Sequence, residues 1–198
     1  MIRGLAFALV GAAACCLSAC KTVPTAPPVP SAPWEARRAA LQERDHFDLS
    51  GRIAVAAAQE GFNAKLRWDQ RGDRSSLALD GPLGVGGVRI TADGTTVNVV
   101  NSRGEPLDSD AARREIAARL GFDPPLQSLR FWVQGVPDPA HPADEVLDDQ
   151  QRLVTLRQDG WQIDYAKYTV AAGQWLPSLL TLRRDDIRVR LLVDNWGS

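Results

Sequence analysis

The chain has 198 residues, of which 44% are hydrophobic and 24% charged, and its formal net charge at pH 7 is −1. This length suits one domain with one sizeable core. The charge balance argues against a nucleic-acid-binding protein, because such proteins carry a basic excess. We therefore expect no nucleic-acid partner.

The first 19 residues have the composition of an export signal. Arg3 supplies the basic start, an apolar run extends from Gly4 to Cys16, and the ending Leu17-Ser18-Ala19-Cys20 resembles a bacterial lipobox. We expect residues 1–19 to be cleaved and Cys20 to be lipidated. Plain secretion and an uncleaved anchor are the alternatives, although the apolar run is short for a membrane-spanning helix of ~20 residues.

All three cysteines of the chain, Cys15, Cys16 and Cys20, lie in this segment. The mature chain therefore keeps no thiol for disulfides, metal binding or nucleophilic chemistry. Removal of Arg3 with the signal leaves 22 basic and 24 acidic residues, a balance of −2.

Residues 20–32 are rich in proline and poor in residues that pack, as "KTVPTAPPVPSA" from Lys21 to Ala32 shows. Such a sequence predicts an acylated, semi-extended tether of ~3 Å per residue. Residues 33–198 then form the globular domain.

The domain opens with a predicted helix from Pro33 to about Asp45, with Trp34 and Leu41 on one face. Alternation of apolar and polar residues next predicts strands whose apolar sides carry Phe47, Leu49, Ile53 and Val55, then Phe62, Ala64, Leu66 and Trp68, then Leu77 and Leu79.

A short strand at Val88 and Ile90, a turn at Asp93-Gly94 and a strand over 95–101 continue this antiparallel meander. Two helices are predicted next, over 108–120 and from Asp123-Pro124 to Gly135, the second with Leu126, Leu129 and Val133 on one face and Trp132 beside them. Strands resume over 152–158, 161–168, 178–183 and 187–194.

This order of elements predicts an α+β, mostly β fold with about 9–11 antiparallel strands, since it lacks a βαβ rhythm. A sheet of that size must curl or close, and it leaves an interior wider than its own side chains fill. We expect an open, incomplete barrel with the helices across its mouth and an apolar cavity inside.

The sequence contains few candidate catalytic residues. His46 and His141 are single histidines, the pairs Asp148-Asp149 and Asp185-Asp186 lie in turn contexts, and no nucleophile, metalloprotease or nucleotide-binding motif occurs. We expect no enzyme, no cofactor and no metal. Arg183, Arg184, Arg188 and Arg190 are typical of a solvated outer face, with attraction to anionic lipid headgroups as the alternative.

The loop "LDGPLGVGG" from Leu79 to Gly87 places a bulky leucine, Leu83, between Pro82 and Gly84. Turn geometry explains the prolines and glycines of such a loop but not a leucine. Leu83 therefore either folds back into a core or contacts something apolar outside the protein.

Seven short motifs, in order along the chain, resemble the LolB family of outer-membrane lipoprotein receptors. They are "SGRIAV" (50–55), "LRW" (66–68), "GPLG" (81–84), "LRFWVQGVP" (129–137), "QDGWQIDY" (158–165), Leu176-Pro177 and "VDNW" (193–196). Together with the lipobox they cover nearly the whole chain.

The resemblance implies an open barrel that accepts the acyl chains of client lipoproteins from the periplasmic carrier LolA. It also implies a lipid-anchored protein of the outer membrane, facing the periplasm, that places its clients in the inner leaflet among the phospholipids, without nucleotide or metal. Lys21 after Cys20 fits outer-membrane sorting. Leu83 matches the leucine by which the family inserts its loop, Pro82 to Gly84, into the membrane, although the continuation Val85-Gly86-Gly87 departs from the family pattern.

We take as candidates for the acyl-chain cavity the apolar residues of the predicted concave side: Phe62, Leu66, Trp68, Leu77, Leu79, Trp132 and Trp161. The alternatives are a lipocalin-like binder of a small apolar ligand, a structural lipoprotein of an outer-membrane assembly, and an esterase. A single domain with a transient partner favours a monomer.

Overall fold

A computed structural model describes residues 32–57, 60–81, 87–94, 96–100, 105–107 and 124–197. The export signal, Cys20, the tether up to residue 31, the loop residues Pro82, Leu83 and Gly84, and the helix predicted over 108–120 lie outside these described residues. In the described part, no helix has both the length and the apolar character needed to cross a membrane.

The described elements are dominated by strands. In chain order they are α1 (Trp34–Gln42), β1 (His46–Ala57), β2 (Glu60–Arg71), β3 (Arg74–Asp80), β4 (Val88–Asp93), β5 (Thr96–Val100), β6 (Pro106–Leu107), α3 (Leu126–Trp132), β7 (Asp144–Leu147), β8 (Leu153–Gln158), β9 (Trp161–Ala171), β10 (Gln174–Arg184) and β11 (Ile187–Trp196).

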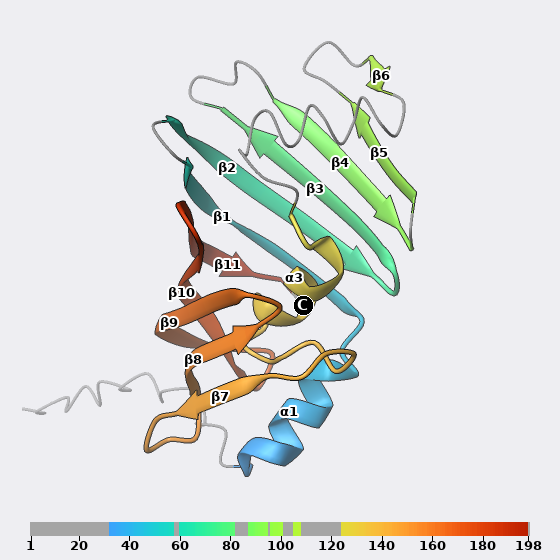
Figure 1. Ribbon diagram of the computed structural model, residues 1–198. Helices are drawn as coiled ribbons and strands as arrows, with labels where there is room; N and C mark the ends of the chain where they lie inside the picture. Colours follow the sequence, from blue (N-terminus) through green and yellow to red (C-terminus); the bar gives the residue numbers. More distant parts are fainter. Residues whose placement is uncertain are drawn as a thin grey trace, which may run out of the picture.

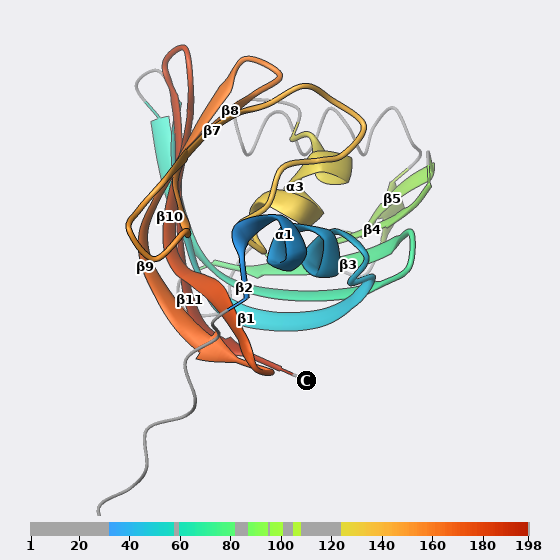
Figure 2. The ribbon, with the colours of Figure 1, turned by 90° about the horizontal axis from the view of Figure 1, so that it is seen from below.

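These strands form one sheet of eleven strands in the order β6-β5-β4-β3-β2-β1-β11-β10-β9-β8-β7 (Figure 1). Every neighbouring pair is antiparallel. The pairing of β1 with β11 joins the first half of the sheet to the second half, and β6 and β7 form its two edges. The sheet curves strongly but does not close, and α1 and α3 lie within the curve (Figure 2). The predicted fold class, mostly β with an open antiparallel sheet of about 9–11 strands, is confirmed.

Alternation along the central strands separates a concave apolar face from a convex polar face. On β1, Phe47, Leu49 and Val55 are buried, whereas Arg52 and Ala56 are exposed. The same alternation holds on β2, where Leu66 and Trp68 are buried, Lys65 and Arg67 are exposed and Asp69 is half-buried. The predicted period of two is therefore confirmed for these strands.

Gly51 lies where the register between β1 and β11 shifts. A Cβ atom added at Gly51 would lie 2.2 Å from the carbonyl oxygen of Leu192, so no larger residue fits without moving the backbone. Such a bulge increases the local twist of a sheet, and this one lies where the two halves of the sheet meet.

The predicted boundaries of two strands are wrong. We expected strands over 161–168 and 178–183, but β9 extends to Ala171 and β10 begins at Gln174. Pro177 stands inside β10 because the register shifts between Pro177 and Leu179, and a bulge tolerates a residue without an N–H. Ala172 and Gly173, both with positive φ, make the tight turn between the strands.

Smaller differences concern short elements. β7 occupies a segment for which we predicted no strand, and α3 spans only Leu126–Trp132, because Pro124 and Pro125 precede it. α1 ends at Gln42 rather than near Asp45, with Trp34 and Leu41 both buried as expected.

The hydrophobic core of the described part runs from Trp34 to Trp196. A chain from Lys21 to Ser198 therefore contains every residue of this core while leaving out Cys20. We refer to it below as the non-acylated chain.

Candidate functional site

The helix α3 crosses the concave side of the sheet and is bonded to turns of its first half. Gln127 Nε2 donates a hydrogen bond to the carbonyl oxygen of Gly94 at 2.8 Å, in the turn after β4. Arg130 Nη1 donates to the carbonyl oxygen of Gly72 at 3.2 Å and forms an ion pair with Asp73, both in the turn after β2. The positions of α3 and of these turns are thus coupled.

The C-terminal end of α3 is bonded to the second half of the sheet. The indole N–H of Trp132 donates to Gln158 Oε1 at 2.7 Å, and the hydroxyl of Tyr165 donates to the carbonyl oxygen of Trp132 at 2.9 Å. The rings of Trp132 and Trp161 pack with centroids 6.3 Å apart. The helix therefore spans the open sheet from one half to the other.

A buried polar network holds the segment after α3. Ser128 Oγ donates to Asp138 Oδ2 at 2.8 Å, and the backbone N–H of Asp138 donates to Gln158 Oε1 at 2.9 Å. Gln158 Nε2 donates in turn to the carbonyl oxygens of Asp138 and His141. Because these buried groups bond to one another, the network holds α3 and the segment after it in place.

The helix α1 holds the edge of the second half. The indole N–H of Trp34 donates to Glu145 Oε2 on β7 at 2.7 Å, and Arg37 Nη2 donates to the carbonyl oxygen of Gln151 at 2.6 Å. Burial lowers the pKa of Arg37 below its ordinary value. The buried guanidinium still bonds to a backbone carbonyl, so this contact anchors α1 beside β7.

The seven predicted cavity residues all lie in or against the core, but they differ in exposure. Five are buried: Leu66, Trp68, Leu77, Trp132 and Trp161. Phe62 and Leu79 are only partly buried and pack against the core from its border. The register places Leu66 opposite Leu79 and Trp68 opposite Leu77, so these four share one face of β2 and β3.

Exposure of the concave face changes along the strands. At the end where β1 begins, Phe47 packs against Trp68 and Trp196 with ring centroids 5.7 Å apart in each pair, and all three residues are buried. Toward the opposite end the burial is mixed: Val55, opposite Phe62, and Val88, opposite Leu79, are buried. Ile53, Phe62 and Leu79 stay partly exposed around the small side chain of Ala64. We call Ile53, Phe62, Ala64 and Leu79 the loop-side patch, because Leu79 lies two residues before Gly81, where the Pro82–Gly84 loop begins.

The sequence prediction missed part of this arrangement. Ile53 belongs to the loop-side patch but was assigned only to the apolar side of its strand. Leu126 and Leu129 on α3 are also partly buried against the core. Their i, i+3 spacing led the sequence analysis to place both on one helix face, but not to count them among the cavity candidates.

The candidate catalytic residues serve local contacts. His46 Nδ1 lies 2.5 Å from the carboxylate of Asp45, and His141 Nδ1 lies 3.3 Å from that of Asp159. Asp148 forms an ion pair with Arg152 at 2.7 Å. Within the described residues, no group of three or more histidine, cysteine or acidic side chains is placed to hold a metal ion.

Comparison with solved structures defines the class of fold. A LolA superfamily protein from Nitrosomonas europaea superposes with a TM-score of 0.51 over 84% of this chain and 93% of that chain, at 12% sequence identity. At this identity the likeness concerns the fold alone. The protein therefore shares the curved, open sheet of that structure.

Sequence comparison is more specific. A family profile described as "Outer membrane lipoprotein LolB" matches residues 45–196. The chain is 36% identical over 179 residues to the outer-membrane lipoprotein LolB of Nitrosococcus oceani, covering 88% of this chain and 89% of that protein. It is 36% identical over 166 residues to the same-named protein of Pseudomonas putida, covering 82% and 80%. This chain belongs to the LolB family, which is named for an outer-membrane lipoprotein rather than for an enzyme.

The two tyrosines of the chain give a test of packing in the second half of the sheet, where the Tyr165 hydroxyl donates to Trp132 of α3 and the Tyr168 hydroxyl donates to the carbonyl oxygen of Leu153. Burial raises the pKa of Tyr165 well above its ordinary value of 10.0 and raises that of Tyr168 also. Both folded-state pKa values exceed the unfolded ones, so their contribution to stability is complete below pH 10 and is lost as the pH rises above it. The loss is up to ~1.4 kcal/mol per pH unit for each tyrosine.

We therefore expect the ultraviolet absorbance of tyrosinate to stay flat as the pH rises past 10 and then to increase together with loss of the sheet's circular dichroism. The Tyr168→Phe variant should show half the absorbance change at the same cooperative transition or an earlier one. A gradual appearance of tyrosinate near pH 10 with the sheet intact would contradict the buried positions of both rings.

Proposed function

We propose that this protein is a receptor that accepts acylated lipoproteins from the periplasmic carrier LolA and places them in the inner leaflet of the outer membrane. The observation that carries the proposal is the loop-side patch, where Ile53, Phe62 and Leu79 are left partly exposed on the concave face of an open sheet. Membership of the LolB family supports it.

The physical need for such a receptor follows from the chemistry of the client. Each methylene of an acyl chain costs ~0.8 kcal/mol when it is exposed to water, so two or three long chains cannot cross the periplasm uncovered. A concave apolar surface that is not filled by its own side chains offers them a place. The predicted cavity residues divide accordingly. Phe62 and Leu79 contact the guest, Leu66, Trp68 and Leu77 form the wall beside it, and Trp132 and Trp161 pack α3 against the second half of the sheet.

The remaining parts of the proposal concern the membrane. Residues 1–19 are the cleaved signal, Cys20 carries the lipid, residues 20–32 are the tether, and residues 33–198 are the domain that faces the periplasm. Lys21 after Cys20 suits sorting to the outer membrane. The domain works as a monomer and uses neither nucleotide nor metal.

Leu83 then contacts the bilayer rather than the core. Burial of one leucine contributes about 2 kcal/mol. That is too little to anchor a protein, but it is enough to orient one that its lipid already holds at the surface. Transfer without an energy source requires the affinity for the acyl chains to rise from carrier to receptor to membrane, and a difference of 1.4 kcal/mol per step is already tenfold. The contact of Leu83 with the bilayer brings the receptor to the membrane, where the client is released.

Transfer from the carrier is the first test. The non-acylated chain is mixed with LolA loaded with a fluorescently labelled lipoprotein, and the partners are then separated. We expect most of the label to move to this protein, whereas the same client without its acyl chains stays behind. Uptake of a free fatty acid without uptake of the lipoprotein would contradict the receptor function and favour a small-ligand binder.

A second prediction locates the guest. The non-acylated chain has no cysteine, so Phe62→Cys or Asn63→Cys introduces a single site for an environment-sensitive fluorophore. Phe62 lies on the concave face and its exposed neighbour Asn63 on the convex face. We expect lipoprotein transfer to shift the emission of the label at residue 62 to the blue and to leave the label at residue 63 unchanged.

Equal spectral shifts at residues 62 and 63, or a shift at residue 63 alone, would contradict placement of the acyl chains on the concave face. The circular dichroism of each labelled variant, compared with that of the unsubstituted chain, shows whether the sheet is retained.

A third prediction concerns the loop. Leu83→Glu should leave the fold and the uptake of label from LolA intact, and should reduce delivery into liposomes about tenfold or more, because a carboxylate opposes insertion into the bilayer. The matched control is Leu147→Glu, which makes the same change at an exposed leucine on the edge strand β7. Delivery by Leu83→Glu that equals delivery by the control would remove Leu83 from the mechanism.

A further inference from the structure

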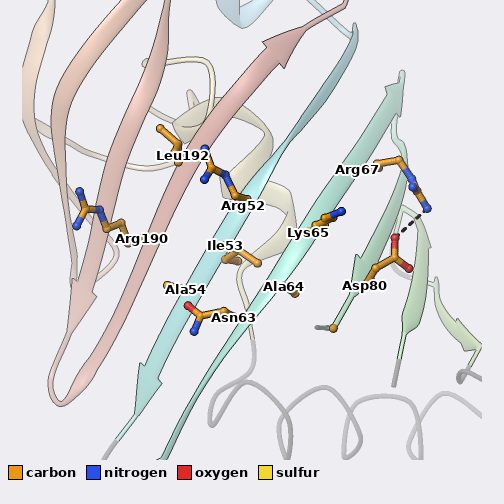
Figure 3. Close-up of a pocket in the computed structure, with 11 residues that line it drawn as sticks. Arg52, Ile53, Ala54, Asn63, Ala64, Lys65, Arg67, Asp80, Arg190 and Leu192 are labelled. Atoms are coloured by element: carbon orange, nitrogen blue, oxygen red, sulfur yellow. Dashed lines mark ion pairs between the residues drawn. The ribbon is translucent and has the colours of Figure 1, made fainter. Parts of the chain in front are cut away.

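A groove on the convex face of the sheet is not explained by the proposed function. It has a volume of about 790 Å³ and crosses β11, β1, β2 and the end of β3 (Figure 3). Volumes of ~300–1,000 Å³ are typical of sites for small molecules. The register places Arg52 beside Lys65 and Leu192, with Asp80 next to Lys65, all on the face opposite to Leu66.

Cations dominate this groove. Four of its lining residues are basic, Arg52, Lys65, Arg67 and Arg190, and one is acidic, Asp80. The lining residues thus carry an excess of three positive charges, or two when Asp194 beside Arg52 is counted, in a chain whose formal net charge is −1. Such a local excess attracts anions from solution.

Ion pairs occupy only some of these cations. Arg67 Nη2 lies 2.9 Å from Asp80 Oδ2, and Arg52 forms a two-pronged contact with Asp194 at 2.8 and 3.1 Å. Lys65 and Arg190 are exposed and have no ion-pair partner among the described residues. They are therefore available to a ligand from outside.

The groove also has apolar lining. Ala54 and Leu192 lie among the basic residues on the convex face. Cations around apolar side chains match a ligand in which a phosphate group lies next to a hydrocarbon part. The headgroup and glycerol of a phospholipid have this character, whereas an acidic protein surface supplies charge without the carbon.

The place of the groove in the chain points to the same ligand. Gly81 lines the groove, and Leu83 follows two residues later, so the Cα atoms of Gly81 and Leu83 are separated by at most ~7 Å. The polar region of each leaflet is about 5–8 Å thick. A leucine at the apolar boundary therefore brings Gly81, and the groove beside it, to the level of the headgroups.

We propose that this convex groove binds the headgroups of anionic phospholipids in a bilayer, with Lys65 and Arg190 contacting the phosphates. The inference rests on the proposed function, because it needs a membrane beside the Pro82–Gly84 loop. It assigns the two faces of one sheet to two lipid partners, the acyl chains of the client on the concave face and the bilayer surface on the convex face. Both can then be bound at once.

The test uses the non-acylated chain and sedimentation with vesicles of phosphatidylethanolamine that contain phosphatidylglycerol as the anionic lipid. The variant Lys65→Gln/Arg190→Gln should bind these vesicles about tenfold more weakly at low ionic strength, since each surface cation near anionic lipid contributes a factor of several. The difference should shrink as salt is added. Phosphatidylcholine vesicles should show no difference.

The matched control is Arg74→Gln/Arg157→Gln, which removes the same charge from exposed positions outside the groove. It should bind like the unsubstituted chain, and Lys65→Arg/Arg190→Lys should retain binding. An equal loss in the control variant, or no loss in the groove variant, would overturn the proposal. So would a groove variant that binds vesicles normally but no longer accepts label from LolA, since that result assigns the groove to an acidic protein partner.

The label-transfer assay separates this inference from the proposed function. The groove variant should take lipoprotein from LolA at the normal rate in the absence of vesicles. Failure of the unsubstituted chain to take up label would refute the receptor function, whereas unchanged vesicle binding by the groove variant refutes the groove alone.

Discussion

The span of α3 across the open sheet is the constraint on which the rest of the structure depends. The seven residues of α3 connect the turns after β2 and β4 to the Gln158 amide and the Tyr165 hydroxyl of the second half. An open sheet has no hydrogen bonds between its edges to fix its curvature, so this helix and the β1–β11 pairing define it. The concave face keeps its shape because the helix is bonded at both ends.

The concave face has a filled part and a part left partly exposed. Phe47, Trp68 and Trp196 pack together where β1 begins, and this cluster supplies the apolar burial that stabilises the fold. The residues of the loop-side patch bury less apolar surface, so they stabilise the fold less. A protein that filled the patch with its own side chains would be more stable and would have no room for a guest, which is a familiar conflict between stability and function.

The sequence predicted the elements whose signal is local and missed those decided by distant contacts. Alternation on β1 and β2 identified their buried faces because a half-buried strand has a period of two. Pro177 misled the prediction, since only the pairing with β9 shows that it stands at a bulge. The sequence also could not show which of the predicted cavity residues are partly exposed. Phe62 and Trp68 follow the same alternation although they differ in exposure. The bonds of α3 to Gly72 and Gly94 could not be predicted either, because a backbone carbonyl is present at every residue type.

In the proposed function, partial exposure of the loop-side patch has an energetic consequence. A deep pocket that buried every methylene of two or three chains at ~0.8 kcal/mol each would hold the client by tens of kcal/mol and would compete with the bilayer itself. A shallow patch at the border of the core covers the chains incompletely, so transfer to a membrane remains downhill. The position of Leu79, two residues before Gly81 and the Pro82–Gly84 loop, places this incomplete cover beside the end of the sheet that we expect to meet the membrane. Weak binding and proximity to the destination then act together to release the client.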